Sequence, residues 1–187
     1  MAHYLRHDTR IETIKNIIAL FQTQFDKVIK ICREDDFDWW DQIYADDTEH
    51  LVGTVFIVLQ NYINSSISDL YPKLSKLHSK YSSDKKIHEK TNITRVELII
   101  ALANYYKHRD LPTELHKYTA NPLEKLQIAY KYFYDLTNNK YFHKMGSESP
   151  IFEGLSILSE GWEFKDLIEI VTEWRENLWN CEIVETK

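Results

Sequence analysis

The densest run of charged and aromatic side chains lies between residues 34 and 49. It contains eight acidic and four aromatic residues, namely Glu34, Asp35, Asp36, Phe37, Asp38, Trp39, Trp40, Asp41, Tyr44, Asp46, Asp47 and Glu49. Tryptophan and tyrosine contribute much of the binding energy at protein interfaces, and flanking charges steer association with an oppositely charged partner. This composition predicts an acidic surface, anchored by aromatic rings, that binds a basic protein. The open alternative is that Trp39 and Trp40 are buried and dock the connection between the first two helices onto the core.

The same carboxylates match no familiar metal site. Asp35, Asp36 and Asp38 lack the glycine and the distal glutamate of an EF-hand loop, and the Glu-x-x-His pattern of ferritin-like sites is absent. Among eight histidines, only His3 and His7 have the spacing of helical metal ligands, and no third ligand accompanies them. The chain also lacks the common glycine-rich nucleotide-binding, serine-hydrolase and zinc-protease motifs. We therefore expect neither a metal nor a cofactor.

A second group of candidate residues lies in the string ANYYKHRD, at residues 103–110. The string resembles the motif that marks HEPN domains, helical bundles in which an arginine, a polar residue, three spacers and a histidine lie near the end of a helix. Asn104 and His108 match this motif, whereas Ala103 stands at the arginine position. The resemblance implies that the arginine binds the scissile phosphate and the histidine transfers a proton in metal-free chemistry at the ribose. Alanine cannot bind phosphate.

A second frame of the motif places Arg109, Asp110 and His116 at its key positions. Arg109 and His116 are seven positions apart, or two turns, so a continuous helix would bring them to one face. Pro112 breaks such a helix. The competing interpretation is structural, because cationic side chains at 107–109 complement the negative end of a helix. The alternative catalytic set, taken from both frames, is Asn104, His108, Arg109 and His116.

The rest of the chain predicts helices, since only four glycines and four prolines interrupt long segments with apolar residues three or four positions apart. Helix starts are indicated at Thr94 with Glu97, Asn121 with Pro122, and Ser149 with Pro150. We expect helices over residues 11–32, 46–69, 94–109, 121–136, 149–158 and 164–179. Segment 52–59 is rich enough in β-branched residues to form a strand in isolation, but its spacing favours a helix. The predicted fold is all-α, with residues 1–187 forming one domain, a single antiparallel helical bundle of five to seven helices.

Aromatic residues are abundant in the second half of the chain: Tyr105, Tyr106, Tyr118, Tyr130, Tyr132, Phe133, Tyr134, Tyr141 and Phe142. At helical spacing they predict core and inter-helix packing rather than platforms on which nucleic-acid bases stack. Four lysines are interspersed with these aromatic residues and are typical of a solvated helix face: Lys125, Lys131, Lys140 and Lys144.

The overall charge indicates the kind of partner. Asp and Glu outnumber Lys and Arg by 29 to 23, and the net charge of −6 argues against a protein whose main task is to bind nucleic-acid phosphates. The longest apolar stretch, 51–59, is far shorter than the roughly 20 residues of a membrane helix. No apolar run follows the charged N-terminus, so we expect no membrane segment, no cleaved signal and a cytoplasmic location. Cys32 and Cys181 lack C-x-x-C spacing and are expected to be reduced and buried.

These features together are similar to those of helical immunity proteins, which protect bacteria from their own contact-dependent or secreted nuclease toxins. The resemblance implies a non-enzymatic protein that binds and neutralises a basic toxin, and a nuclease is the expected class because nucleases present strongly positive surfaces. One open alternative is a HEPN-like ribonuclease or the RNA-binding component of a toxin–antitoxin pair. Another is a homo-oligomer that uses the aromatic segment against a second copy. The expected assembly is a monomer or a homodimer.

Overall fold

The computed structural model describes residues 7–34, 42–70, 81 and 83–185, and for 33–34, 42–43, 70 and 181–185 it describes the backbone alone. Predicted binding residues 35, 36, 38, 39, 40 and 41 lie outside the described part of the chain. The described residues are mostly helical. In chain order they form α1 (Ile11–Glu34), α2 (Gln42–Leu70), α4 (Arg95–His108), α5 (Lys117–Lys125), β1 (Lys131–Asp135), β2 (Lys140–His143), the short 3-10 helix η2 (Gly146–Glu148), α6 (Pro150–Leu158) and α7 (Phe164–Glu185).

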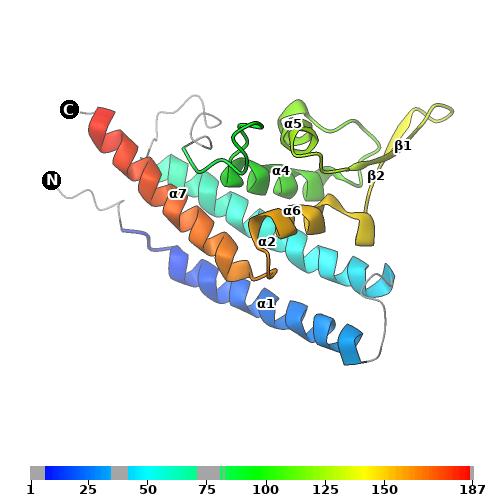
Figure 1. Ribbon diagram of the computed structural model, residues 1–187, viewed down its shortest axis with the longest axis horizontal. Coiled ribbons are helices and arrows are strands. Elements are labelled where there is room, and N and C mark those ends of the chain that lie inside the picture. Colours follow the sequence, from blue (N-terminus) through cyan, green and yellow to red (C-terminus); the bar gives the residue numbers. More distant parts are fainter. Residues whose placement is uncertain (1–6, 35–41, 71–80, 82, 186–187) are drawn as a thin grey trace.

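Helix α2 is the centre of the packing. Figure 1 shows it between α1 on one side and α4 on the other, and it also contacts α6, α7 and η2. Val52, Val55 and Phe56 are completely buried in the single cluster of core residues. The prediction of a helix over 52–59 is confirmed, because a helix that is buried on two sides can use β-branched residues for packing.

One glycine permits the close approach of α2 and α4. The ring of Tyr106 packs so tightly on Gly53 that a Cβ added there would lie 2.3 Å from ring atom Cδ2. A side chain larger than hydrogen therefore does not fit between the two helices at this point.

Two predicted helix starts are confirmed. Thr94 Oγ1 accepts the N–H of Glu97 at 3.1 Å, and the Glu97 carboxylate accepts the N–H of Thr94 at 2.9 Å, so both halves of the capping box are formed. Ser149 caps α6 by accepting the N–H of Ile151 at 3.2 Å, and Pro150 occupies the first turn. Helix α4 ends at His108, before Pro112, as the sequence predicts.

The predicted helix over 121–136 is wrong, although the described residues are mostly helical, in line with the predicted helical fold, and add one small sheet. Helix α5 begins at Lys117, after the N-cap His116, and ends at Lys125. Residues 131–143 instead form an antiparallel hairpin, the one sheet among the described residues. Aromatic residues favour extended backbone, and Asn139 adopts a positive φ of 54° in the hairpin turn.

The Asp135 side chain explains why the chain turns here. Its carboxylate accepts the backbone N–H groups of Thr137 at 2.9 Å and Asn138 at 3.3 Å, an Asx turn that reverses the chain after β1. Within the part of the chain that is described, no helix is long and apolar enough to cross a membrane.

Candidate functional site

The described remainder of the predicted acidic surface lies at the beginning of α2. Asp46 and Asp47 are exposed there, and Tyr44 is half-buried. The Glu34 side chain lies outside the described residues. Two carboxylates of the predicted surface therefore face solvent on the first turns of α2.

Glu49 is not part of any surface, and this prediction is wrong. Its side chain lies on the α2 face that also carries Ala45, Thr48 and Val52, all buried. Glu49 is 1% exposed and forms an ion pair with Arg109, itself 7% exposed. Its second carboxylate oxygen accepts the N–H of Gly146 at 2.7 Å. A buried carboxylate needs such partners, and Glu49 receives them from two distant parts of the chain.

Arg109 is equally unavailable to a ligand. Besides its ion pair with Glu49, the guanidinium lies over the ring of Tyr106, 4.7 Å from the ring centroid. Burial lowers the pKa of Arg109, and the carboxylates of Asp110 and Asp46 oppose that shift. The predicted catalytic role of Arg109, which implies a phosphate contact, does not fit this buried position.

The other three residues of the alternative catalytic set do come together. Asn104, His108 and His116 line one open hollow of about 360 Å³, beside Thr113, Tyr118 and Thr119. His116 caps α5, where its Nδ1 accepts the N–H of Tyr118 at 3.4 Å. The two histidines belong to different frames of the motif, and because His108 ends α4 whereas His116 caps α5, the loop around Pro112 brings them together. No continuous helix does so.

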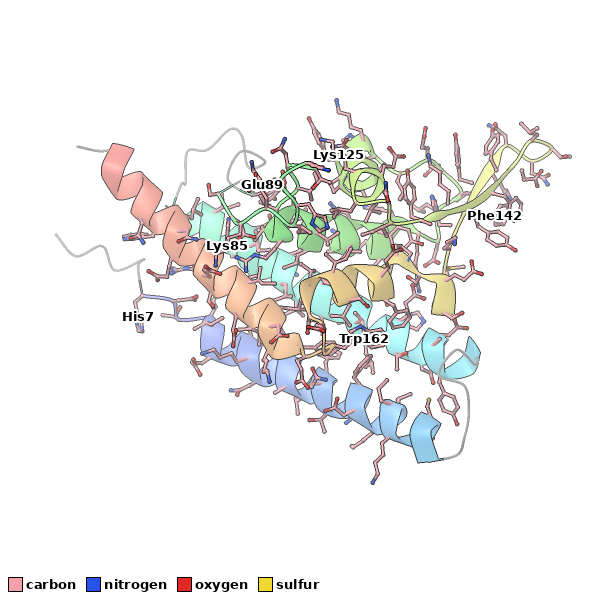
Figure 2. The ribbon with its side chains drawn as sticks, viewed as in Figure 1. His7, Lys85, Glu89, Lys125, Phe142 and Trp162 are labelled. Carbon is pink, nitrogen blue, oxygen red and sulfur yellow. The ribbon has the colours of Figure 1, made fainter. Side chains whose placement is uncertain are left out.

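A surface that the sequence analysis missed is the hairpin. Four of its aromatic rings are uncovered: Tyr132 is 64% exposed, Phe133 48%, Tyr134 38% and Phe142 42%. We call these four residues the hairpin surface. Figures 1 and 2 show the hairpin projecting from one end of the molecule, with Phe142 away from the helices. The prediction that these residues pack in the core is wrong, although it holds for the buried Tyr105 and Tyr130.

The rings of the hairpin pack on one another instead, and Tyr134 lies against Tyr141 with centroids 4.5 Å apart. Phe133 and Phe142, which are paired across the strands, stack with centroids 4.5 Å apart, and Tyr132 contacts Phe133 at 5.1 Å. The missed signal was the repeated Lys-Tyr-Phe pattern on both sides of Asn138 and Asn139, which is typical of two strands joined by a turn. Because these rings remain between 38% and 64% exposed, the hairpin leaves a large aromatic area in contact with water.

The base of the hairpin is fixed to the helices by hydrogen bonds. His143 Nδ1 lies 3.0 Å from the carbonyl oxygen of Arg109, and the Tyr105 hydroxyl donates to the carbonyl of Lys144. The bond from Gly146 to Glu49 holds the segment just after β2 on α2. Burial raises the pKa of Tyr105, so this hydroxyl remains a neutral donor. The buried Glu49–Arg109 pair therefore positions the hairpin.

Metal ligation has no support among the described residues, which contain no cluster of three or more His, Cys, Asp and Glu side chains suited to an ion. The side chain of Cys32 is buried, as predicted, whereas the side chain of Cys181 lies outside the described residues. Comparisons of this chain with protein-family models, curated proteins and solved structures found no match.

Proposed function

We propose that this protein acts by binding a basic protein and transforms no substrate itself. The observation that carries the proposal is the hairpin surface, four uncovered aromatic rings on a ribbon that projects from the helices. Scattered apolar residues are normal on a soluble protein, but contiguous aromatic rings are typical of an interface. Burying one such ring against a partner contributes roughly 1.5–3 kcal/mol.

The charge of the surroundings supports a basic partner. The N-terminal turns of α2 carry the exposed Asp46 and Asp47, and η2, which directly follows the hairpin, packs on this same part of α2. The acidic residues of 35–41 immediately precede α2 in the chain. The exposed carboxylates at the start of α2 would attract a cationic protein, and the aromatic rings of the hairpin would then hold it.

A nuclease toxin is the partner class that the sequence resemblance implies. The predicted immunity mechanism is occlusion, in which the carboxylates take the place of substrate phosphates at the toxin's active-site groove while the hairpin rings anchor the contact. The predicted single antiparallel bundle of five to seven helices would supply the rigid support for this surface.

The test uses a toxin domain encoded next to the gene for this chain. We expect tight binding, with Phe133→Ser and Phe142→Ser together weakening it at least about tenfold, or 1.4 kcal/mol. The triple change Asp35→Asn, Asp36→Asn and Asp38→Asn should slow association and flatten its salt dependence. Light scattering at several concentrations checks whether the hairpin rings bind a second copy. Toxin binding that is indifferent to both sets of changes would contradict the proposal.

One observation favours a second candidate, a metal-independent ribonuclease: Asn104, His108 and His116 line one hollow. Two histidines can act as general acid and general base at a phosphodiester. For this function, purified protein should cleave RNA in the presence of a chelator, and His108→Ala or His116→Ala should abolish cleavage. Intact RNA after incubation with micromolar protein would remove this candidate.

A further inference from the structure

A second open hollow, of about 430 Å³, adjoins the histidine hollow and shares Asn104 and Tyr118 with it. It lies where α2, α4 and α5 meet, and Tyr81 contributes to it from the segment before α4. The lining residues used below are Gln60, Asn64, Tyr81, Asn104, Lys107 and Tyr118. Both volumes fall within the ~300–1,000 Å³ of typical small-molecule sites.

Lys107 determines how the amides in this hollow are oriented. Its Nζ donates to Gln60 Oε1 at 2.6 Å, and Gln60 Nε2 donates to Asn104 Oδ1 at 2.9 Å. An ammonium group can only donate, so the Gln60 oxygen must face Lys107 and the Gln60 NH₂ must face Asn104. The Asn104 oxygen is thus the acceptor for Gln60, and the NH₂ group of Asn104 is its donor toward a ligand. In the same hollow, the oxygen of Asn64 is taken by the Tyr81 hydroxyl at 2.8 Å.

The hollow is therefore rich in donors and carries a cation. Among the described residues, Lys107 makes no ion pair, and burial lowers its pKa with no nearby charge opposing the shift. Glu97 is the one carboxylate in the described lining of this larger hollow, and one of its oxygens is used in the capping box. Glu114 lines the smaller hollow. A ligand that pairs with the cation and accepts hydrogen bonds from these donors must supply negative charge and several acceptor oxygens, as a phosphate does.

The aromatic residues indicate a flat group beside that anion. The ring of Tyr118 is 55% exposed and belongs to the lining of both hollows, and Tyr81 lines the larger one. Tyr118 shares this edge with the His116 ring, whose centroid is 5.0 Å away, and with Lys117 Nζ, which lies 5.2 Å from the centroid of the Tyr118 ring. A base can stack on the exposed part of the Tyr118 ring. Next to Tyr118, the smaller hollow adds His108, His116 and Thr119 as further partners for phosphate oxygens.

We propose that the two adjoining hollows bind a nucleoside monophosphate. The base stacks on Tyr118 among the carboxamides, and the phosphate is held by Lys107 and the NH₂ group of Asn104. This site is separate from the hairpin surface and does not depend on partner binding through it. The negative net charge of the chain disfavours a long RNA strand and leaves a free mononucleotide as the ligand.

The test is calorimetric titration of the full chain with adenosine and guanosine 5′-monophosphates, adenosine, inorganic phosphate and a short RNA. We expect at least one monophosphate to bind about tenfold tighter than adenosine or inorganic phosphate. Lys107→Gln and Tyr118→Ala should each weaken binding by roughly tenfold. Lys125→Gln, which removes a lysine of α5 outside both hollows, is the matched control and should leave the affinity unchanged.

Three results would overturn the proposal. The first is no binding of either monophosphate at roughly millimolar concentration. The second is equal affinity in Lys107→Gln, and the third is binding of the short RNA without binding of a mononucleotide. Hairpin variants that lose the protein partner should still bind the nucleotide, so the two proposals fail separately. Nucleotide binding without RNA cleavage would support this site and remove the ribonuclease.

Discussion

The helical core and the hairpin use aromatic residues in opposite ways. Tyr105 of α4 is completely buried, whereas Tyr132 of β1 is 64% exposed. The two regions differ in how many elements of secondary structure cover them. Helix α4 is packed against α2, α5, α6 and α7. In the described chain, β1 has β2 as its one neighbour in the sheet. An apolar side chain is buried only where a second layer covers it. The exposed rings of the hairpin are thus available to a partner, and those of the core are not.

The largest test of this comparison truncates one phenylalanine in each region. Phe56→Ala removes a completely buried ring from α2 and should lower the free energy of unfolding by about 3–5 kcal/mol. Phe142→Ala removes a ring that is 42% exposed and stacks on Phe133, so we expect a loss below about 1.5 kcal/mol. Urea denaturation measures both. Equal losses would mean that the hairpin surface is structural, and the distinction between the regions would be lost.

The link between the two regions is the buried Glu49–Arg109 pair. Glu49→Ala leaves the arginine charge buried without its carboxylate and should cost about 3–5 kcal/mol in the free energy of unfolding. It also removes the acceptor for Gly146 and should loosen the hairpin base. Asp47→Ala, two residues away and exposed, is the matched control, with an expected change within about 0.5 kcal/mol. If both variants unfold at the same urea concentration, the pair does not hold the hairpin.

A smaller effect tests how tightly α2 and α4 are packed. Gly53→Ala would place its Cβ 2.3 Å from the ring of Tyr106, and we expect a loss of roughly 1–3 kcal/mol as the ring moves. Gly161→Ala is the control, because the nearest side-chain atom, on Glu163, would be 3.5 Å away. Thermal unfolding should separate the two variants clearly. A stable Gly53→Ala protein would show that the helices can separate at this point without cost.

The sequence predicted the parts of this molecule that local rules control. The capping box at Thr94 and the cap at Ser149 each depend on residues within three positions, and both are formed. Glu49 and Arg109 are far apart in the chain, so no local pattern shows that they pair, and acidic composition alone placed Glu49 on the surface. The aromatic residues of the hairpin also fit helical spacing, so their pattern alone does not distinguish two strands joined at Asp135 from a continuous helix.

The sequence likewise predicts some residues of the candidate sites and not others. Motif spacing identified Asn104, His108 and His116, which do share a hollow, but it also included the buried Arg109. For Lys107 the sequence predicts only a positive charge near the end of a helix. Its contact with Gln60 of α2, 2.6 Å long, depends on the packing of two helices and has no signature in either helix alone.

The smallest expected effect concerns the turn that joins the two strands of the hairpin. Hydrogen bonds from the Asn138 side chain and from the Thr137 N–H lower the pKa of Asp135. A carboxylate with a lowered pKa in the folded state stabilises that state above its unfolded pKa, and the stabilisation is lost as the pH falls through the lower, folded value. The hairpin should therefore loosen below about pH 4, which is near the ordinary pKa of aspartate. Amide hydrogen exchange of residues 131–143 at a series of pH values measures this.

Two variants make the acid effect specific to that turn. Asp135→Asn keeps one acceptor oxygen but cannot titrate, so hairpin exchange in this variant should lose its acid transition. Asp26→Asn changes an exposed carboxylate of α1, which accepts a hydrogen bond from Gln22, and should leave the hairpin transition in place. An unchanged transition in Asp135→Asn would mean that the strands are held by their aromatic pairs alone. The hairpin would then resemble the core, stabilised by packing, and would not be a ribbon whose shape depends on its turn.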